Sequence, residues 1–249
     1  MTLYNFKKIN GKKKIIWIPN RGRGLREAKN RIGDLEKEVK QLLKKKRKIK
    51  VLDIGTGYGK ILLELKKIFG NKVETYGINL EPRWNLKLIR KFAISNNLFS
   101  KKEANKIVPK VYIADAGKRM PLKSSSFDLI FALASVQYIP DKARFLEEVN
   151  RLLTKEGKAV IELQERKSKH PIEYRSLFEI WDAGKEINLI KYLKQYKGIK
   201  IKKSPREWHV LIMKKSKNFR FNLELINFIN LNKICKSWWG TKSVYRMKD

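Results

Sequence analysis

A glycine-rich segment, residues 51–60, reads VLDIGTGYGK and combines residue types that suit ligand binding. Gly55, Gly57 and Gly59 stand at alternate positions between a hydrophobic run and an amphipathic stretch. A glycine-rich turn from strand to helix lets the backbone approach a ligand closely and points the N–H groups of the helix N-terminus at it. The spacing differs from the dinucleotide pattern GxGxxG, and the chain contains no GxxxxGK[ST] phosphate loop. We therefore predict a loop that cradles a small ligand.

Three further segments follow this loop in the chain. They read YGINLEP at residues 76–82, ADAGKRMPLKSSSFDLI at 114–130 and RLLTKEGKAVIEL at 151–163. Together with the glycine segment, they resemble the ordered motifs of the class I, Rossmann-like S-adenosylmethionine-dependent methyltransferases. The resemblance implies an enzyme that uses S-adenosyl-L-methionine as its methyl donor.

The resemblance also implies which residues hold this cofactor. They are Asp53, Gly55, Thr56, Gly57, Gly59, Asn79, Leu80, Glu81, Asp115 and Ala116. In the family, the acid at the position of Asp53 lies near the methionine end, and the acid at the position of Asp115 lies beside adenine. The ribose-binding acid aligns with Asn79, which carries no charge, while Glu81 stands two residues further on. The ribose contact is therefore left open between Asn79 and Glu81.

The residues around the acceptor site give a weaker signal. Methyl transfer from a sulfonium is an in-line displacement that depends mainly on orientation, so a dedicated base is optional. The sequence after the expected fourth strand lacks the Asn/Asp-Pro-Pro-aromatic motif of adenine amino methylation. Gln137 and Tyr138 are the candidate catalytic residues, placed to contact or stack on a base, although Tyr138 suits a core position equally well. Two isolated histidines, His170 and His209, predict no metal site.

The fold expected from hydrophobic patterning is a doubly wound, mostly parallel seven-stranded sheet. Seven β-type runs support it, at residues 50–54, 73–80, 110–114, 127–133, 158–163, 199–203 and 207–214. A hairpin around Asn10-Gly11 and one amphipathic helix over residues 25–46 precede the sheet. Helices are expected at residues 172–183, 186–196 and 223–234. The predicted division is a basic N-terminal hairpin and helix (1–48), a methyltransferase domain (49–214) and a basic, aromatic, helical C-terminal extension (215–249).

The charge of the chain indicates a polyanionic partner. Lys and Arg total 59 against 24 Asp and Glu, a formal net charge of +35, and nucleic acid is the polyanion that such an excess favours. Trp17, Trp238, Trp239 and Tyr245 stand among basic residues and offer stacking surfaces for unpaired bases, or else pack on the domain. A basic tail with tryptophans also suits an anionic membrane.

Three functions follow from these observations. The first is methylation of RNA, with rRNA or tRNA preferred and the mRNA cap guanine as a further substrate. The second is methylation of a small molecule or lipid, and the third is an inactive methyltransferase-like RNA-binding or assembly factor. The single cysteine, Cys235, excludes an intramolecular disulfide. Because no run of about 18 apolar residues occurs, we expect no transmembrane segment and a cytoplasmic protein.

Overall fold

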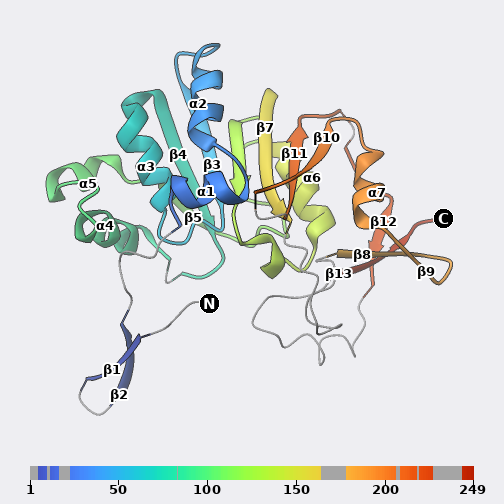
Figure 1. The fold of residues 1–249 in the computed structure, drawn as a ribbon, viewed down its shortest axis with the longest axis horizontal. Helices are drawn as coiled ribbons and strands as arrows, with labels where there is room; N and C mark the ends of the chain where they lie inside the picture. Colours follow the sequence, from blue (N-terminus) through green and yellow to red (C-terminus); the bar gives the residue numbers. More distant parts are fainter. Residues whose placement is uncertain are drawn as a thin grey trace.

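A seven-stranded sheet forms the centre of the structure, which is a computed structural model (Figure 1). The structure describes residues 5–9, 12–16, 23–82, 84–163, 178–205, 208–217, 219–226 and 243–249. Across the sheet the strands are β10 (Ile199–Lys203), β11 (His209–Lys214), β7 (Leu153–Leu163), β6 (Phe127–Ala132), β3 (Ile49–Ile54), β4 (Val73–Asn79) and β5 (Lys110–Ile113). Six of them run in one direction, and β11 is antiparallel to both of its neighbours. The predicted fold class and the seven strands are confirmed.

Helices cover both faces of this sheet, as crossover connections between parallel strands require. Their bounds are α1 (Leu25–Arg31), α2 (Leu35–Leu43), α3 (Lys60–Phe69), α4 (Leu86–Ser95), α5 (Lys101–Ile107), α6 (Lys142–Leu152) and α7 (Leu189–Lys194). On one face, Val39 of α2 and Leu62 of α3 belong to the same buried cluster as Leu129 of β6. On the other face, Phe145 of α6 packs in a cluster with Ile130 of β6. Strand β6 is therefore buried on both sides, which explains why residues 129–132 are all apolar.

The helix expected over residues 25–46 is wrong as a single element, because it breaks between α1 and α2. Gly33 has a φ of +121°, which ends the helical path. Asp34 then caps the second helix, and its side chain accepts a hydrogen bond from the Lys37 backbone N–H at 3.0 Å. Apolar periodicity runs through the break and hides it.

A second sheet occupies part of each helix expected near the C-terminus. Its strands, in order, are β12 (Leu223–Leu225), β13 (Ser243–Met247), β8 (Phe178–Asp182) and β9 (Lys185–Ile187). Ala183 and Gly184, both with positive φ, form the two-residue turn between β8 and β9, so the helix expected at 172–183 is wrong over residues 178–183. Residues 172–177 lie outside the described part. The helix expected at 186–196 shrinks to α7. The helical tail expected at 223–234 begins instead as β12, and residues 227–234 lie outside the described part.

The N-terminal hairpin is present as β1 (Asn5–Ile9) and β2 (Lys12–Ile16), which form a separate two-stranded sheet. Trp17, His170, Cys235, Trp238 and Trp239 lie outside the described residues. Within the described part of the chain, no helix is both long and apolar enough to cross a bilayer.

Candidate functional site

The glycine segment forms the connection from β3 to α3 at the carboxyl edge of the parallel strands. Gly55, Gly57 and Gly59 have φ values of +78°, +53° and +69°, a region that residues with a Cβ rarely adopt. Gly55 also has a close neighbour, because an added Cβ would lie 2.3 Å from Ser135 Cβ. Gly57 differs, since an added Cβ would meet no atom within 4 Å. The loop therefore presents bare backbone to an open space at Gly57.

Asn79, the last residue of β4, fixes this loop from the neighbouring strand. Its Oδ1 accepts a hydrogen bond from the Gly57 N–H at 2.8 Å, and its Nδ2 lies 3.4 Å from the Gly57 carbonyl oxygen. The same Nδ2 donates to the Trp84 carbonyl oxygen at 2.9 Å. Asn79 is buried, and its amide is largely used within the protein. Its role in the structure is to position the glycine loop.

Asp53 is a buried carboxyl group beneath the loop. Burial raises the pKa of Asp53 to about 7. The nearby Thr56 hydroxyl lowers this pKa by a smaller amount, although its geometry is not that of a regular hydrogen bond. No cation among the described residues forms an ion pair with Asp53. Thr56 Oγ1 is buried and lacks a hydrogen-bond partner within the same residues. Both groups are suited to a polar, cationic ligand that would supply these interactions.

The ends of β4 and β5 place the other predicted cofactor residues beside each other. The Ala114 N–H donates to the Asn79 carbonyl oxygen at 2.9 Å, which joins the two strand ends. Asp115 is half-buried, and its Oδ1 accepts a hydrogen bond from the Gly117 N–H at 2.8 Å. Ala116 is buried, whereas Leu80 and Glu81 are exposed. The predicted set is thus brought to one edge of three adjoining strands, β3, β4 and β5.

The loop after β6 forms the other wall of this edge. Ser135 Oγ donates to the Ile54 carbonyl oxygen at 2.7 Å, which ties the loop to the end of β3. Gln137 is buried, and its Nε2 donates to the Ala134 carbonyl oxygen at 3.0 Å, while its Oε1 has no partner among the described residues. Tyr138 is 51% exposed, so the alternative prediction that it is a core residue is wrong.

A buried ion pair supports this wall, and motif reasoning missed it. Glu162 of β7 accepts hydrogen bonds from Arg31 Nε at 2.7 Å and Nη2 at 2.9 Å, and from the Ala134 N–H at 2.7 Å. The Arg31 guanidinium lies 4.4 Å from the centroid of the Trp208 ring. The only available sequence signal was an acid inside the apolar run AVIEL. Such an acid requires a partner, but the sequence does not show which one.

The second sheet is hydrogen-bonded to the start of α6, next to this wall. The Tyr245 hydroxyl donates to Asp141 Oδ1 at 3.0 Å and accepts from the Ala143 N–H at 3.1 Å. Ser243 Oγ is bonded to the Pro140 carbonyl oxygen and to Lys142 Nζ. Tyr245 is 1% exposed. It is therefore a core residue, and its expected availability for base stacking is wrong.

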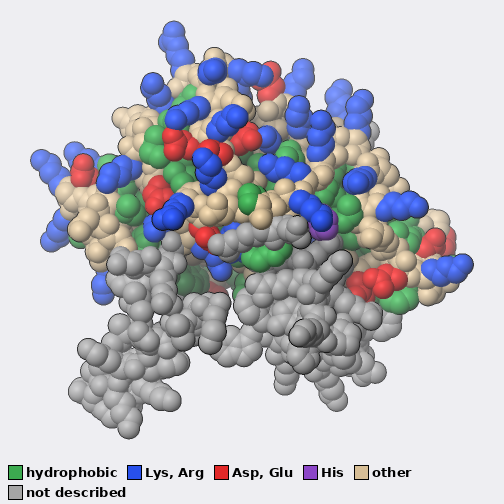
Figure 2. Space-filling view, in the orientation of Figure 1, with side chains coloured by type: hydrophobic (Ala, Val, Ile, Leu, Met, Phe, Trp, Pro, Cys, Tyr) green, Lys and Arg blue, Asp and Glu red, His purple; other side chains and the backbone are tan. Residues whose placement is uncertain are grey.

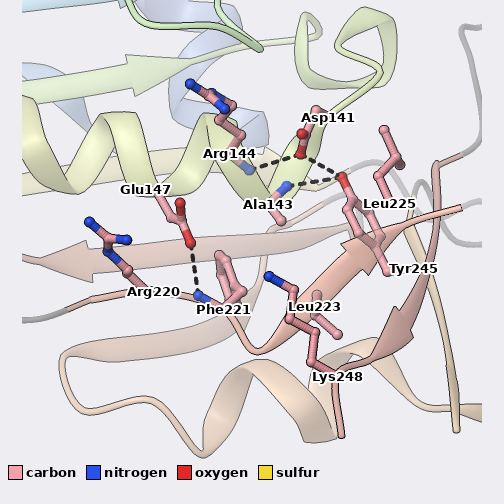
Figure 3. Close-up of a pocket in the computed structure, with 10 residues that line it drawn as sticks. All are labelled: Asp141, Ala143, Arg144, Glu147, Arg220, Phe221, Leu223, Leu225, Tyr245 and Lys248. Carbon is pink, nitrogen blue, oxygen red and sulfur yellow. Dashed lines mark hydrogen bonds between the residues drawn. The ribbon is translucent and has the colours of Figure 1, made fainter.

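A cavity of about 200 Å³ lies between α6 and the second sheet (Figure 3). Its lining includes Arg144 and Glu147 of α6, together with Arg220 and Lys248 from the C-terminal region. Glu147 is already engaged, since its Oε1 accepts from the Phe221 N–H at 2.8 Å. None of the predicted cofactor residues lines this cavity. It is separate from the edge that carries the glycine loop.

A seven-stranded sheet with one antiparallel strand, β11, and a glycine loop at the carboxyl ends of the parallel strands is the arrangement of the class I methyltransferase fold. The chain belongs to the family described as a methyltransferase domain, whose sequence profile matches residues 45–215. The crystal structure of the CurJ carbon methyltransferase has the same fold, with a TM-score of 0.51, 14% identity, and coverage of 74% of this chain and 53% of that one.

Two curated relatives resemble the chain over a shorter stretch. The sterol 4-C-methyltransferase strm-1 of Caenorhabditis elegans is 29% identical over 140 residues, which cover 56% of this chain and 37% of that protein. The chloroplastic tocopherol O-methyltransferase of Arabidopsis thaliana is 31% identical over 112 residues, which cover 45% of this chain and 29% of that protein. The matched stretch thus spans about a third of the length of these relatives.

The residues at the carboxyl edge fit S-adenosylmethionine, the cofactor of this family. The open space at Gly57 admits a ligand against bare backbone. The buried Asp53 carboxyl group and the unpartnered Thr56 hydroxyl suit the charged methionine portion. Asp115 uses Oδ1 in its hydrogen bond with the Gly117 N–H, which leaves Oδ2 as an acceptor for a ligand. Asn79 is buried, whereas Glu81 is exposed, so Glu81 is the more accessible candidate for the ribose hydroxyl groups.

Proposed function

We propose that this chain methylates a small lipophilic acceptor at the carboxyl edge of the sheet. The observation that carries the proposal is the composition of the wall after β6. Residues 133–139 read LASVQYI and contain no acid or base other than the Tyr138 phenol. Leu133, Val136 and Ile139 are buried in this wall, and Tyr138 exposes about half of its surface. Such a wall binds an apolar molecule better than a charged one.

Bound S-adenosylmethionine would supply an electrophilic methyl group at this edge. The residues of the chain then orient the acceptor, and orientation alone supplies much of the rate in an in-line displacement. Gln137 Oε1 is buried and lacks a donor among the described residues, so an acceptor hydroxyl group is a suitable donor for it. Tyr138 provides an apolar ring face with a polar tip.

The relatives favour this proposal over RNA methylation. One is named for a sterol and the other for tocopherol, both lipophilic small molecules. RNA as the methylated substrate, which the charge of the sequence suggested, has no support from either relative.

The test is transfer of a tritiated methyl group from S-adenosylmethionine into separate preparations of lipid extract, total RNA and total protein. We expect label in an organic-soluble product, unaffected by ribonuclease. Label that enters RNA and disappears after ribonuclease treatment would contradict the proposal. Tyr138→Ala is expected to raise KM for the lipophilic acceptor at least severalfold and to leave the affinity for the cofactor unchanged.

A further inference from the structure

The basic residues of the chain are arranged in a line at the edge of the sheet opposite the glycine loop. The sheet has six parallel strands, and an exposed Lys or Arg lies near the start of each one, from four residues before the first residue of the strand to two residues after it. These residues, from β10 across to β5, are Lys197, Lys155, Lys123, Arg47, Lys72 and Lys110. We call this set the basic rim. Its members are far apart in the chain, four in connections and two in the first residues of β7 and β5, so only the folded sheet brings them together.

The spacing of the basic rim follows from the sheet. Neighbouring strands lie about 4.8 Å apart, so the seven positions from β10 to β5 span roughly 29 Å. Strand β11, which runs the other way, ends at this edge with Lys214, which is also exposed. Each strand of the sheet therefore contributes a cation to a row along this edge. Figure 2 shows Lys and Arg side chains projecting along the upper margin of the molecule, and red acidic side chains are few there.

Acids near this edge do not neutralise the row. Glu74, the second residue of β4, pairs with Lys48 at 2.7 Å, and Asp128, the second residue of β6, pairs with Lys46 at 2.5 Å. No member of the basic rim forms an ion pair with a described residue. Crowding of positive charge is also evident at Lys66, whose pKa is lowered by burial and then by the Lys48 ammonium. Glu156, beside Lys155, is the exposed acid on this edge.

We propose that the basic rim binds the phosphate backbone of a nucleic acid. A row of cations matches a linear polyanion, and phosphate contacts of this kind give affinity without sequence preference. The rim offers no aromatic stacking surface among its members, so binding depends on phosphate and falls steeply with salt.

An anionic membrane fits the rim less well. Membrane-surface sites insert apolar side chains, and the exposed large hydrophobic residue near this edge in the described part is Ile68. In addition, strand β3 has six residues, which places the rim about 20 Å from the glycine loop. A membrane on the rim would hold the methyl-transfer edge facing away from the bilayer. A nucleic acid on the rim leaves that edge free.

The test compares two triple variants that each remove three positive charges. Arg47→Gln, Lys72→Gln and Lys155→Gln change the rim, whereas Lys87→Gln, Lys91→Gln and Lys101→Gln change exposed lysines on α4 and α5. Binding of a fluorescein-labelled 20-nucleotide oligouridylate is measured by anisotropy between about 50 and 300 mM salt. We expect the rim triple to weaken binding about tenfold or more and to lower the slope of log K against log salt by about 2, which is three contacts at ~0.7 each.

The control triple is expected to weaken binding less than threefold and to keep the slope of the wild type. Equal losses in the two triples would overturn the proposal, because binding would then follow net charge and not the rim. Absence of oligouridylate binding would also overturn it, as would rim-dependent binding to vesicles of phosphatidylserine and phosphatidylcholine without oligouridylate binding. Methyl transfer to a small acceptor should be unchanged in both triples. Failure of the nucleic-acid proposal can therefore be told apart from failure of the proposed methyl-transfer function.

Discussion

Asn79 holds Gly57 through both ends of its amide: Oδ1 accepts the Gly57 N–H at 2.8 Å, and Nδ2 lies 3.4 Å from the Gly57 carbonyl oxygen. A carboxylate at this position would keep the first contact and lose the second. It would also face the Trp84 carbonyl oxygen, which now accepts from Nδ2. The amide is therefore required by this loop, although the family commonly has an acid there.

Asn79→Asp should destabilise the protein and not improve it. We expect a loss of about 1–3 kcal/mol in the free energy of unfolding, because buried acceptors lose their donor. Denaturant unfolding measures this loss, and calorimetry with S-adenosylmethionine should show weaker binding. Asn85→Asp is the matched control, since Asn85 caps α4 from an exposed position, where an acid is favourable. A variant Asn79→Asp with wild-type stability would show that the amide bonds contribute little.

Gly57→Ala should abolish cofactor binding at a small cost in stability. Both Gly57 and Gly70 have φ near +55° with no atom within 4 Å of an added Cβ, but Gly70 lies at the end of α3, on the opposite edge of the sheet. Gly57→Ala should lose about 1–2 kcal/mol in stability because of the positive φ. Gly70→Ala should lose at least as much, because φ +55° with ψ −131° lies outside the left-handed helical region and suits glycine alone. Isothermal calorimetry should detect lost affinity for S-adenosylmethionine in Gly57→Ala alone. Equal affinities in the two variants would place the cofactor away from this loop.

Cofactor affinity should depend on the ionisation of Asp53. Burial raises the pKa of Asp53 to about 7, so the free protein protonates this carboxyl group as the pH falls through 7. A protonated carboxyl group loses its attraction for the cationic methionine portion, and affinity for S-adenosylmethionine should therefore fall between pH 8 and pH 6. Calorimetry across this range measures the change. Asp53→Asn should bind weakly with little pH dependence, and a wild-type affinity that is flat with pH would contradict this role.

The same pKa predicts how the stability of the free protein depends on pH. The unfolded chain releases the Asp53 proton near pH 4, whereas the folded chain keeps it until about pH 7. Between these values the folded state binds more protons, so the contribution of Asp53 to stability declines as the pH rises from 4 to 7. Urea unfolding at several pH values, compared between wild type and Asp53→Asn, isolates this contribution. The difference between the two curves should become constant above pH 7.

Tyr245→Phe should impair acceptor binding more than cofactor binding. The lost hydroxyl group leaves the buried Ala143 N–H without its acceptor. It also removes one of the two hydrogen bonds to Asp141, which follows the wall that carries Tyr138. We expect a loss of about 1–3 kcal/mol in stability and a raised KM for the acceptor. Tyr192→Phe is the control, because it removes the Tyr192–Tyr196 hydroxyl contact in the same buried cluster, away from this wall. Equal effects of the two variants on KM would show that Tyr245 acts only through the general stability of the protein and would contradict this prediction.

The central sheet was predictable because its signals are local. Strands such as β6 are buried on both faces and contain apolar runs, LIFA in β6, and the glycine loop directly follows β3. The cofactor residues come with those strands, since carboxyl ends of parallel strands meet at one edge. The choice between Asn79 and Glu81 for the ribose contact could not be predicted in this way. It depends on the hydrogen bonds of Asn79 to Gly57 and Trp84, which no local sequence pattern encodes.

The second sheet and the buried ion pair were not predictable in this way. β12 has three residues, and β13 pairs with β8 in parallel from more than 60 residues away in sequence. Short strands with such distant partners carry almost no periodic signal. Arg31 and Glu162 are separated by 131 positions, so their pairing also depends on the complete fold.

The pair formed by Arg31 and Glu162 also bears on where this protein can be divided. A fragment that starts at residue 49, the predicted domain boundary, would keep Glu162 but lose the Arg31 guanidinium that pairs with it. A buried carboxylate without its cation lowers the free energy of unfolding by several kcal/mol. It would also uncover the apolar surface of β6 on which α2 packs. We therefore expect the first two helices to belong to the same folding unit as the sheet, so that a fragment without them is much less stable.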